Sequence, residues 1–418
     1  MIRLIPLAIG CIFALQSFFS FAFASELSDN YPLEKVVVLS RHNLRAPLAS
    51  PDSIISQITP HTWFSWTSRS GELSLKGGEI ETLMGQYFRL WLEEEKLIPI
   101  NYEPAFGDVR FYSNSFQRTI ATAQYFSSGM LPVANVHIEH HLGLNESDPV
   151  FILTRQLPIN DDNFLRKSEE ELSAMGGTKA IGEGAASAVA LVENVLDFKT
   201  SKYAEENNIT TFPTDDITLT LDKSYNFDGS IRPAMKAADA LVLQYYEEPD
   251  ATKAAFGHQL TDEEWTEIGR LKELSLHTIY CMPSISTVIA QPLLEVMLNE
   301  LRLDGRKFTF LCGHDTNLCT VLSALGIEDY TLPNTIEPDT PIGAKLLIEK
   351  RRGTDGQAYA SLSLVYQSTE QIRNREMLSL DHPPMIVPLR LKGLYANEDG
   401  LYLFSELEKR FSDAIDKY

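Results

Sequence analysis

Two short apolar runs, about 270 residues apart, end in the same way. The run at 36–39 leads into His42 within RHNLR, and the run at 308–312 leads into His314 within GHD. In an open α/β sheet, the loops that leave the carboxyl ends of different strands meet in one crevice. We therefore expect an α/β fold that brings these two distant histidines into one site.

Strand and helix patterns alternate at both ends of the 418-residue chain, which exceeds the usual size of one domain. Apolar runs predict strands at 36–40, 109–113, 308–312, 344–349 and 359–366. Amphipathic patterns predict helices at 76–95, from about Ser115 with Asn114 or Ser113 as N-cap, and at 185–198, 234–247 and 262–278. We predict an α/β domain of residues 25–145 plus 281–418, with a mixed sheet flanked by helices on both faces. Residues 146–280 are predicted to form an inserted, mainly helical domain.

The first 24 residues are predicted to be a cleaved export signal. Arg3 is their only charged residue, a long apolar run follows from Leu4, and an A-x-A pattern ends the segment at residues 22–24. An uncleaved membrane anchor is the alternative, and a lipoprotein signal through Cys11 is a weaker one. The interpretation predicts an exported protein that does not associate with the membrane after cleavage.

The chain is strongly acidic, with a formal net charge of −21. Such a field opposes binding to nucleic acid or anionic membranes, and no basic stripe is interleaved with aromatic residues. Because salt screens charges over about 8 Å, a local arginine cluster can still bind a phosphate group within a cleft. We expect a small-molecule partner and no nucleic acid.

Three cysteines remain after the predicted signal: Cys281, Cys312 and Cys319. An odd and sparse set in an exported protein allows at most one disulfide. We interpret Cys312 and Cys319 as small buried apolar residues rather than disulfide partners.

Arg41 and Arg45 flank His42 at the end of the first predicted strand. Guanidinium groups match the oxygens of a phosphate dianion, so this pattern favours a phosphate site. A solvated basic loop is the alternative, since short motifs recur by chance. The second pair, His314 and Asp315, shifts the interpretation towards phosphate chemistry.

These stretches resemble the histidine acid phosphatases, and within them the bacterial periplasmic glucose-1-phosphatases. The resemblance rests on RHNLRAPL, SNSFQRTIATAQYF, LQYYE, HDTNL, PIGAK and YQSTEQIRN, which span residues 36 to about 375. It implies a phosphoglycerate-mutase-like fold, a periplasmic location, and hydrolysis of phosphate esters with no metal or other cofactor.

The resemblance also implies roles for individual residues. His42 is expected to be the nucleophile and to form a phosphohistidine, and Asp315 the general acid, which predicts activity on the acid side of neutral. The expected donors to the phosphoryl oxygens are Arg41, Arg45, Arg118 and His314. From position alone, Arg118 could be a solvated helix arginine, and Asp315 or Thr316 could merely cap a helix beginning near Asn317.

A compact HIEHH segment contains His137, Glu139, His140 and His141. Alternate residues of a strand could face one metal ion there, but a surface strand explains the segment better. Other phosphatase classes are excluded because the chain lacks a Walker loop, a cysteine followed six positions later by arginine, and a suitable D-x-D pair.

Four positions bear on the substrate. Phytases that resemble this chain commonly carry a lysine just after the arginine motif, where this chain has Leu48 and Ala49, and Asn43 replaces a common glycine. Glu247 resembles a carboxylate over the substrate entrance that accepts sugar hydroxyls and repels further phosphates; an ordinary exposed glutamate at a helix end is the alternative.

These features predict a phosphomonoesterase for sugar phosphates, with glucose 1-phosphate as the expected substrate. A 3- or 6-phytase acting on inositol hexakisphosphate is the near alternative. A phosphomutase and a non-catalytic sugar-phosphate binder remain open as further alternatives. A homodimer is possible from the sequence.

Overall fold

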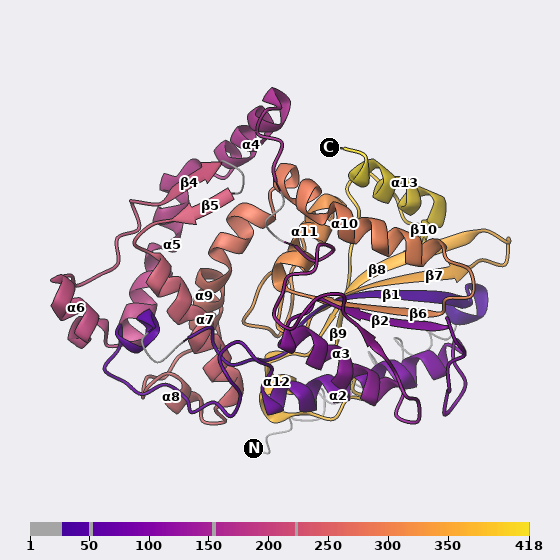
Figure 1. Cartoon of the computed structure of the whole chain (residues 1–418), viewed down its shortest axis with the longest axis horizontal. Coiled ribbons are helices and arrows are strands. Elements are labelled where there is room, and N and C mark those ends of the chain that lie inside the picture. The colour runs from indigo at the N-terminus through magenta and orange to yellow at the C-terminus, as the bar shows by residue number, and fades with distance from the viewer. Residues whose placement is uncertain (1–26, 50–52, 153–155, 222–224, 418) are drawn as a thin grey trace, which may run out of the picture.

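The computed structural model describes residues 27–49, 53–152, 156–221 and 225–417. The predicted export signal, residues 1–24, lies outside these ranges. A large β-sheet with helices on both faces forms one side of the molecule, and a group of helices lies beside it (Figure 1). The predicted α/β fold with a mixed sheet is therefore confirmed.

The large sheet has eight strands in the order β10-β8-β7-β1-β6-β2-β3, with β9 paired to β8. Its strands are β1 (Leu33–Arg41), β2 (Val109–Ser113), β3 (Ile138–Glu139), β6 (Phe308–Gly313), β7 (Lys345–Arg352), β8 (Ala358–Tyr366), β9 (Met385–Pro388) and β10 (Tyr402–Leu403). The central strands β1, β6 and β2 run parallel, whereas β7 and β8 are antiparallel to their neighbours. All five strands predicted from apolar runs are present.

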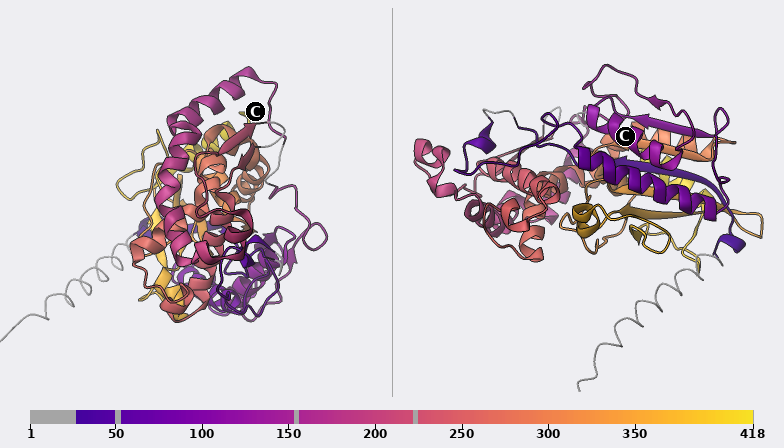
Figure 2. Two further views of the ribbon diagram at one scale, coloured as in Figure 1. Left: turned by 90° about the vertical axis from the view of Figure 1, so that its left-hand side faces the viewer. Right: turned by 90° about the horizontal axis from the view of Figure 1, so that it is seen from below.

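Side chains of β1 alternate between two apolar cores. Val36 and Val38 pack with residues of α2 (Leu75–Glu94) and α3 (Gln117–Met130). Val37 and Leu39 pack on the opposite face with residues of the helices α10 (Pro283–Arg302), α11 (Asp315–Ala324) and α13 (Phe404–Ile415). Figures 1 and 2 show these two helical layers. Burial on both faces explains why the sequence reads as a continuous apolar run.

The helices beside the sheet come from the middle of the chain (Figure 1). They are α4 (Asp162–Ala174), α5 (Gly177–Val195), α6 (Lys202–Asn207), α7 (Arg232–Glu247), α8 (Ala251–Ala254), α9 (Asp262–Ser275) and a π-helical turn, Leu276–Tyr280. A hairpin of β4 (Thr218–Leu221) and β5 (Tyr225–Asp228) joins them. Short helices at Ile54–Ser56, Phe198–Thr200 and α12 (Thr369–Asn374) complete the fold. The domain boundaries remain a prediction.

Within the described ranges, no single helix is long and apolar enough to cross a membrane. Residues 262–280 and 283–302 reach that length and composition only as a pair bent by 85°. Both segments contribute side chains to apolar cores, in which Trp265 and Leu294 are almost completely buried.

A disulfide joins Cys281 to Cys319, so the interpretation of Cys319 as a simple buried apolar residue is wrong. The bond links the residue after the π-helical turn to the middle of α11. A sequence separation of 38 residues gave no indication that these segments meet. Cys312 is free and buried, as predicted.

Candidate active site

The parallel strands β1, β6 and β2 end at the same edge of the sheet. Arg41 is in register with Gly313, and Ser113 with Cys312, so the next residues of all three strands emerge side by side. The rings of His42 and His314 consequently lie edge to face, with 5.5 Å between their centroids. The expected convergence of the two distant motifs is observed.

His42 is buried at this edge, and hydrogen bonds to backbone carbonyl groups fix its position there. Its amide nitrogen donates to Gly313 O (3.0 Å), and its ring Nδ1 lies 2.9 Å from Asn43 O. Because a carbonyl oxygen can only accept, Nδ1 carries the proton and the lone pair is on Nε2. Burial lowers the pKa of His42 well below its usual value, and the neighbouring cations, Arg118 foremost, lower it further. The ring is therefore an unprotonated base.

His314 presents its protonated Nδ1 to the site, whereas His42 presents the lone pair of Nε2. Asn114 Oδ1 accepts from two backbone N–H groups, so its amide nitrogen faces His314 Nε2 at 2.9 Å. His314 Nε2 is thus the acceptor, and Nδ1 carries the proton beside Arg118 Nη2, 3.3 Å away. Burial lowers the pKa of His314 to about 3, and Arg118 contributes to the shift, so the ring is neutral. Two donors side by side suit a shared oxygen of an anion.

The other two arginines are held by carboxylates. Arg41 Nη2 lies 3.3 Å from Asp315 Oδ2, and Arg45 Nη2 lies 3.1 Å from Asp239 Oδ2. Burial, together with the nearby charge of Arg45, lowers the pKa of Arg118 to about 10, which still leaves Arg118 charged at neutral pH. The site therefore concentrates positive charge around an unprotonated histidine, as an anion site requires.

Asp315 is the first residue of α11, which excludes the alternative that Asp315 or Thr316 caps this helix. His314 occupies the N-cap position, and its backbone N–H donates to Asn317 Oδ1 at 3.0 Å, so neither Asp315 nor Thr316 caps the helix. Burial by itself raises the pKa of Asp315, but the charges of Arg41 and then Lys272 outweigh it and hold the pKa below its usual value. Asp315 is therefore ionised in the free protein.

The helix carrying Arg118 also begins differently from the prediction. α3 starts at Gln117, with Phe116 as N-cap and no side-chain cap. Asn114, predicted as a cap, instead orients His314, while Arg118 packs over the Phe116 ring at 4.8 Å. A cap pattern and a ligand-orienting amide look the same in sequence, which explains the error.

A buried ion pair between Glu81 and Lys345 holds the loop after His42 in place. Asn43 Nδ2 donates to Glu81 Oε2 (2.6 Å), and Lys345 Nζ lies 2.9 Å from Glu81 Oε1. Gly343 has a φ of +68°, and a β-carbon there would lie 2.7 Å from Asn43 Nδ2. The sequence PIGAK therefore supplies both a glycine that makes room for Asn43 and a lysine that pairs with Glu81, the residue to which Asn43 donates.

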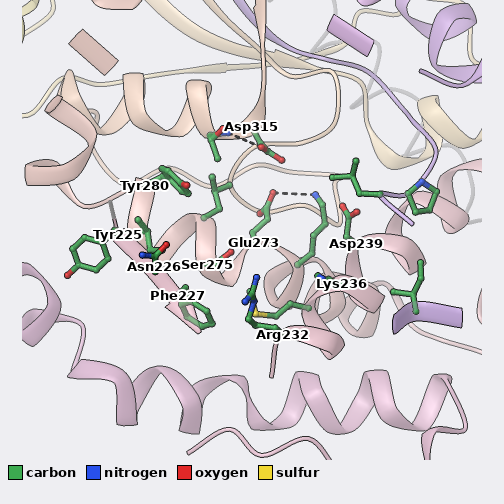
Figure 3. Close-up of a pocket in the computed structure, with 18 of the residues that line it drawn as sticks. Tyr225, Asn226, Phe227, Arg232, Lys236, Asp239, Glu273, Ser275, Tyr280 and Asp315 are labelled. Atoms are coloured by element: carbon green, nitrogen blue, oxygen red, sulfur yellow. Dashed lines mark hydrogen bonds and ion pairs between the residues drawn. The ribbon is translucent and has the colours of Figure 1, made fainter. Parts of the chain in front are cut away.

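A cavity of about 440 Å³ opens from this edge towards α7, α9 and β5. Figure 3 shows Asp315 on one side, Arg232, Lys236 and Asp239 of α7 on another, and Glu273 between them in this view. Burial raises the pKa of Glu273 to about 7, although Lys272 opposes the shift. The α7 and α9 residues escaped the sequence interpretation; the only available signal was the helical spacing of 232, 236 and 239, which any amphipathic helix shows.

Glu247 is not among the residues that line this cavity, and its expected role over the substrate entrance stays a prediction. It ends α7, eight residues beyond Asp239, and its carboxyl group interacts with Ser74 and Lys76. Burial raises the pKa of Glu247 above its usual value. Leu48, in contrast, lies on the cavity wall with 65% of its surface exposed.

The histidines of HIEHH take other roles. Only Ile138 and Glu139 form strand β3, and Glu139 Oε2 accepts from Arg110 Nη2 at 2.9 Å. His141 Nδ1 lies 3.4 Å from Asp148. Among the residues that the structure describes, no group of three or more histidine, cysteine or acidic side chains is arranged to hold a metal ion.

The fold and the site together define an enzyme that handles phosphate groups. The chain matches the histidine phosphatase superfamily (branch 2) over residues 32–367. It is 32% identical to a glucose-1-phosphatase from Providencia rettgeri over 397 residues, 92% of each chain. It is 27% identical to the phytase AppA of Escherichia coli K12, over 86% of this chain and 87% of that protein. The phytase from Citrobacter braakii superposes with a TM-score of 0.82 at 26% identity, covering 93% of this chain and 97% of that one.

The chain therefore belongs to branch 2 of the histidine phosphatase superfamily and is a phosphatase of the histidine acid phosphatase type. The family expected from the RHNLR and GHD motifs is confirmed. Neither the choice of substrate nor the role of each residue follows from family membership alone.

Proposed function

We propose that this chain is an exported acid phosphomonoesterase that hydrolyses a sugar phosphate, glucose 1-phosphate foremost, through a phosphohistidine on His42. One observation carries the proposal: His42 is held with a free lone pair on Nε2 at an edge where Arg41, Arg45, Arg118 and His314 converge. A non-catalytic binder could use the same arginines but would not need an unprotonated, oriented nucleophile.

In the first step, His42 Nε2 attacks phosphorus and the bond between phosphorus and the sugar oxygen breaks. The arginines and His314 Nδ1–H donate to the phosphoryl oxygens as negative charge develops on them. Asp315 gives its proton to the departing sugar oxygen, which is a poor leaving group as an alkoxide. In the second step, water attacks phosphorus, the bond between phosphorus and His42 Nε2 breaks, Asp315 takes the proton from the water, and inorganic phosphate is released.

Asp315 must gain a proton before it can give one. In the free protein the charges of Arg41 and Lys272 keep it ionised. A phosphate dianion that binds Arg41 and Arg45 neutralises that charge and adds its own, so it raises the pKa of Asp315. Substrate binding thereby prepares the acid, and the enzyme works on the acid side of neutral.

The cavity supports a compact, hydroxyl-bearing leaving group. Asp239 and Glu273 place carboxyl groups on its wall, where they can form hydrogen bonds with sugar hydroxyls, and the carboxylate of Asp239 can oppose a second phosphate. Leu48 supplies no charge for further phosphates. Phytase action is the second candidate, favoured by Arg232 and Lys236 on the same wall.

A substrate panel with purified protein in EDTA tests the proposal. We expect steady release of inorganic phosphate from glucose 1-phosphate at acid pH, faster than from inositol hexakisphosphate. Faster release from inositol hexakisphosphate would establish the phytase alternative, and no release from any ester would refute the catalytic proposal. Localisation of the native protein by cell fractionation tests export.

A further inference from the structure

A buried carboxylate outside the phosphatase motifs, Glu337, reaches the site from the loop between α11 and β7. Glu337 has no exposed surface, and each of its oxygens accepts two donors. Oε1 accepts from Arg41 Nη1 (2.9 Å) and from Lys272 Nζ, and Oε2 accepts from Tyr246 OH (3.0 Å) and Ile342 N (2.9 Å). A carboxylate with every acceptor position used is held rigidly.

Glu337 binds the Nη1 group of Arg41 and leaves the Nη2 group available to the site. Arg41 Nη1 donates to Glu337 and to Thr340 O, both on the loop, whereas Nη2 faces Asp315 at 3.3 Å. Only 1% of Arg41 is exposed. A buried guanidinium needs a partner throughout turnover, because an unpaired buried charge is strongly unfavourable.

We infer that Glu337 is a positioning residue, the permanent counter-ion of Arg41, which leaves Arg41 Nη2 free to exchange Asp315 for a phosphoryl oxygen. The inference rests on the proposed function, since it assigns Arg41 Nη2 to the phosphate.

The charges make this division of roles necessary. Asp315 must become protonated to act as an acid, and it then no longer neutralises Arg41. If Asp315 were the only carboxylate on Arg41, the ion pair would oppose that protonation and would compete with the substrate. With Glu337 in place, Arg41 keeps one carboxylate partner while Asp315 takes up and gives its proton.

Glu337 also couples the site to the helices that form the cavity wall. Tyr246 belongs to α7 and Lys272 to α9, so one carboxylate is bonded to both helices and to the end of β1. Loss of Glu337 should therefore disturb phosphate binding even though this residue does not line the cavity.

The test is the affinity for inorganic phosphate of Glu337→Gln, measured by isothermal titration calorimetry. We expect binding weaker by about tenfold or more, as for loss of a charge-assisted contact. Glu349→Gln is the matched control, because Glu349 also pairs with a buried arginine, Arg351 Nη2 at 2.5 Å, but on strand β7. This control should bind phosphate within twofold of the wild type.

A positioning role further requires that the effect pass through Arg41. In an Arg41→Ala background, adding Glu337→Gln should weaken phosphate binding by no more than about twofold. A full tenfold effect in that background, or wild-type affinity in Glu337→Gln itself, would overturn the inference.

Two measurements keep the test decisive. If Glu337→Gln does not fold, as judged by circular dichroism, Tyr246→Phe removes a single donor to Glu337 and should weaken phosphate binding two- to fivefold; no change would overturn the inference. Release of inorganic phosphate from an ester by the wild type separately tests the proposed function. A wild-type protein that binds phosphate but hydrolyses no ester would refute catalysis, and the effect of Glu337→Gln on phosphate binding could still be interpreted.

Discussion

Replacing Asp315 with asparagine should slow the release of a sugar far more than the release of a good leaving group. Asp315 is partly exposed, with 31% of its side chain accessible, and its carboxylate pairs with Arg41 Nη2 at 3.3 Å. Asparagine keeps the size and the start of α11 but cannot transfer a proton. General acid catalysis contributes about 100-fold to 10,000-fold, or roughly 3 to 5 kcal/mol.

The assay is the single-turnover rate of phosphoryl transfer to His42, measured by rapid quench with two esters. For glucose 1-phosphate we expect the Asp315→Asn rate to fall by that factor. For p-nitrophenyl phosphate, whose leaving group departs without a proton, the rate should fall by less than about tenfold. Single turnover isolates the first step from the later attack of water, which also uses Asp315.

Comparison of the two esters within one variant provides the control, because any general distortion of the site slows both. Equal slowing of the two esters would refute the assignment of Asp315 as the acid. Circular dichroism and thermal unfolding of the variant should match those of the wild type.

Three further predictions follow from the structure. Arg118→Ala should lower kcat/KM about 100-fold to 1,000-fold, as for loss of one transition-state donor; a change below fivefold would place Arg118 outside the site. Cys281→Ser with Cys319→Ser should lower the free energy of unfolding in urea by roughly 4 kcal/mol, since the disulfide closes a loop of 38 residues; unchanged stability would contradict this. Burial raises the pKa of Glu273 from 4.5 to about 7, so the folded protein binds this proton more tightly than the unfolded chain does. The contribution of Glu273 to the free energy of unfolding should therefore be fully present below about pH 4.5 and should decline by about 3 kcal/mol at most as pH rises through 7. Urea titrations at several pH values measure this decline, and Glu273→Gln should remove it.

The sequence predicted the framework of the site because local patterns encode it. The run at 36–39 reads as a strand buried on both faces, and that strand delivers His42 to the sheet edge. The parallel pairing of β1 with β6 then places His314 and Asp315 beside it. Strand order explains why two short motifs, each ambiguous alone, were informative together.

The residues that surround this framework could not be predicted, because their positions depend on packing between distant segments. Asp239, Lys272 and Glu337 lie on two helices and a loop that meet only through tertiary contacts. No local pattern distinguishes them from solvated side chains. The cavity is likewise lined by the first half of α7 and not by its end, where Glu247 lies.

The prediction of Asn114 as a helix cap failed for a different physical reason. Asn114 and Asp315 both precede or begin helices and have side chains typical of N-caps. The structure uses Asn114 to orient His314, and it uses the backbone of His314 itself at the N-cap of α11. Helix capping and site chemistry favour the same side chains, so only the three-dimensional structure distinguishes a capping residue from a site residue.

The central claim is that His42 carries the phosphoryl group between two transfers. The direct test is mass spectrometry of protein quenched during turnover of glucose 1-phosphate, with peptide mapping under conditions that preserve acid-labile phosphate. The account predicts one phosphate on His42, and none in His42→Ala or in wild-type protein quenched before substrate is added. Steady turnover with no phosphate on His42, or with the phosphate on another residue, would contradict it.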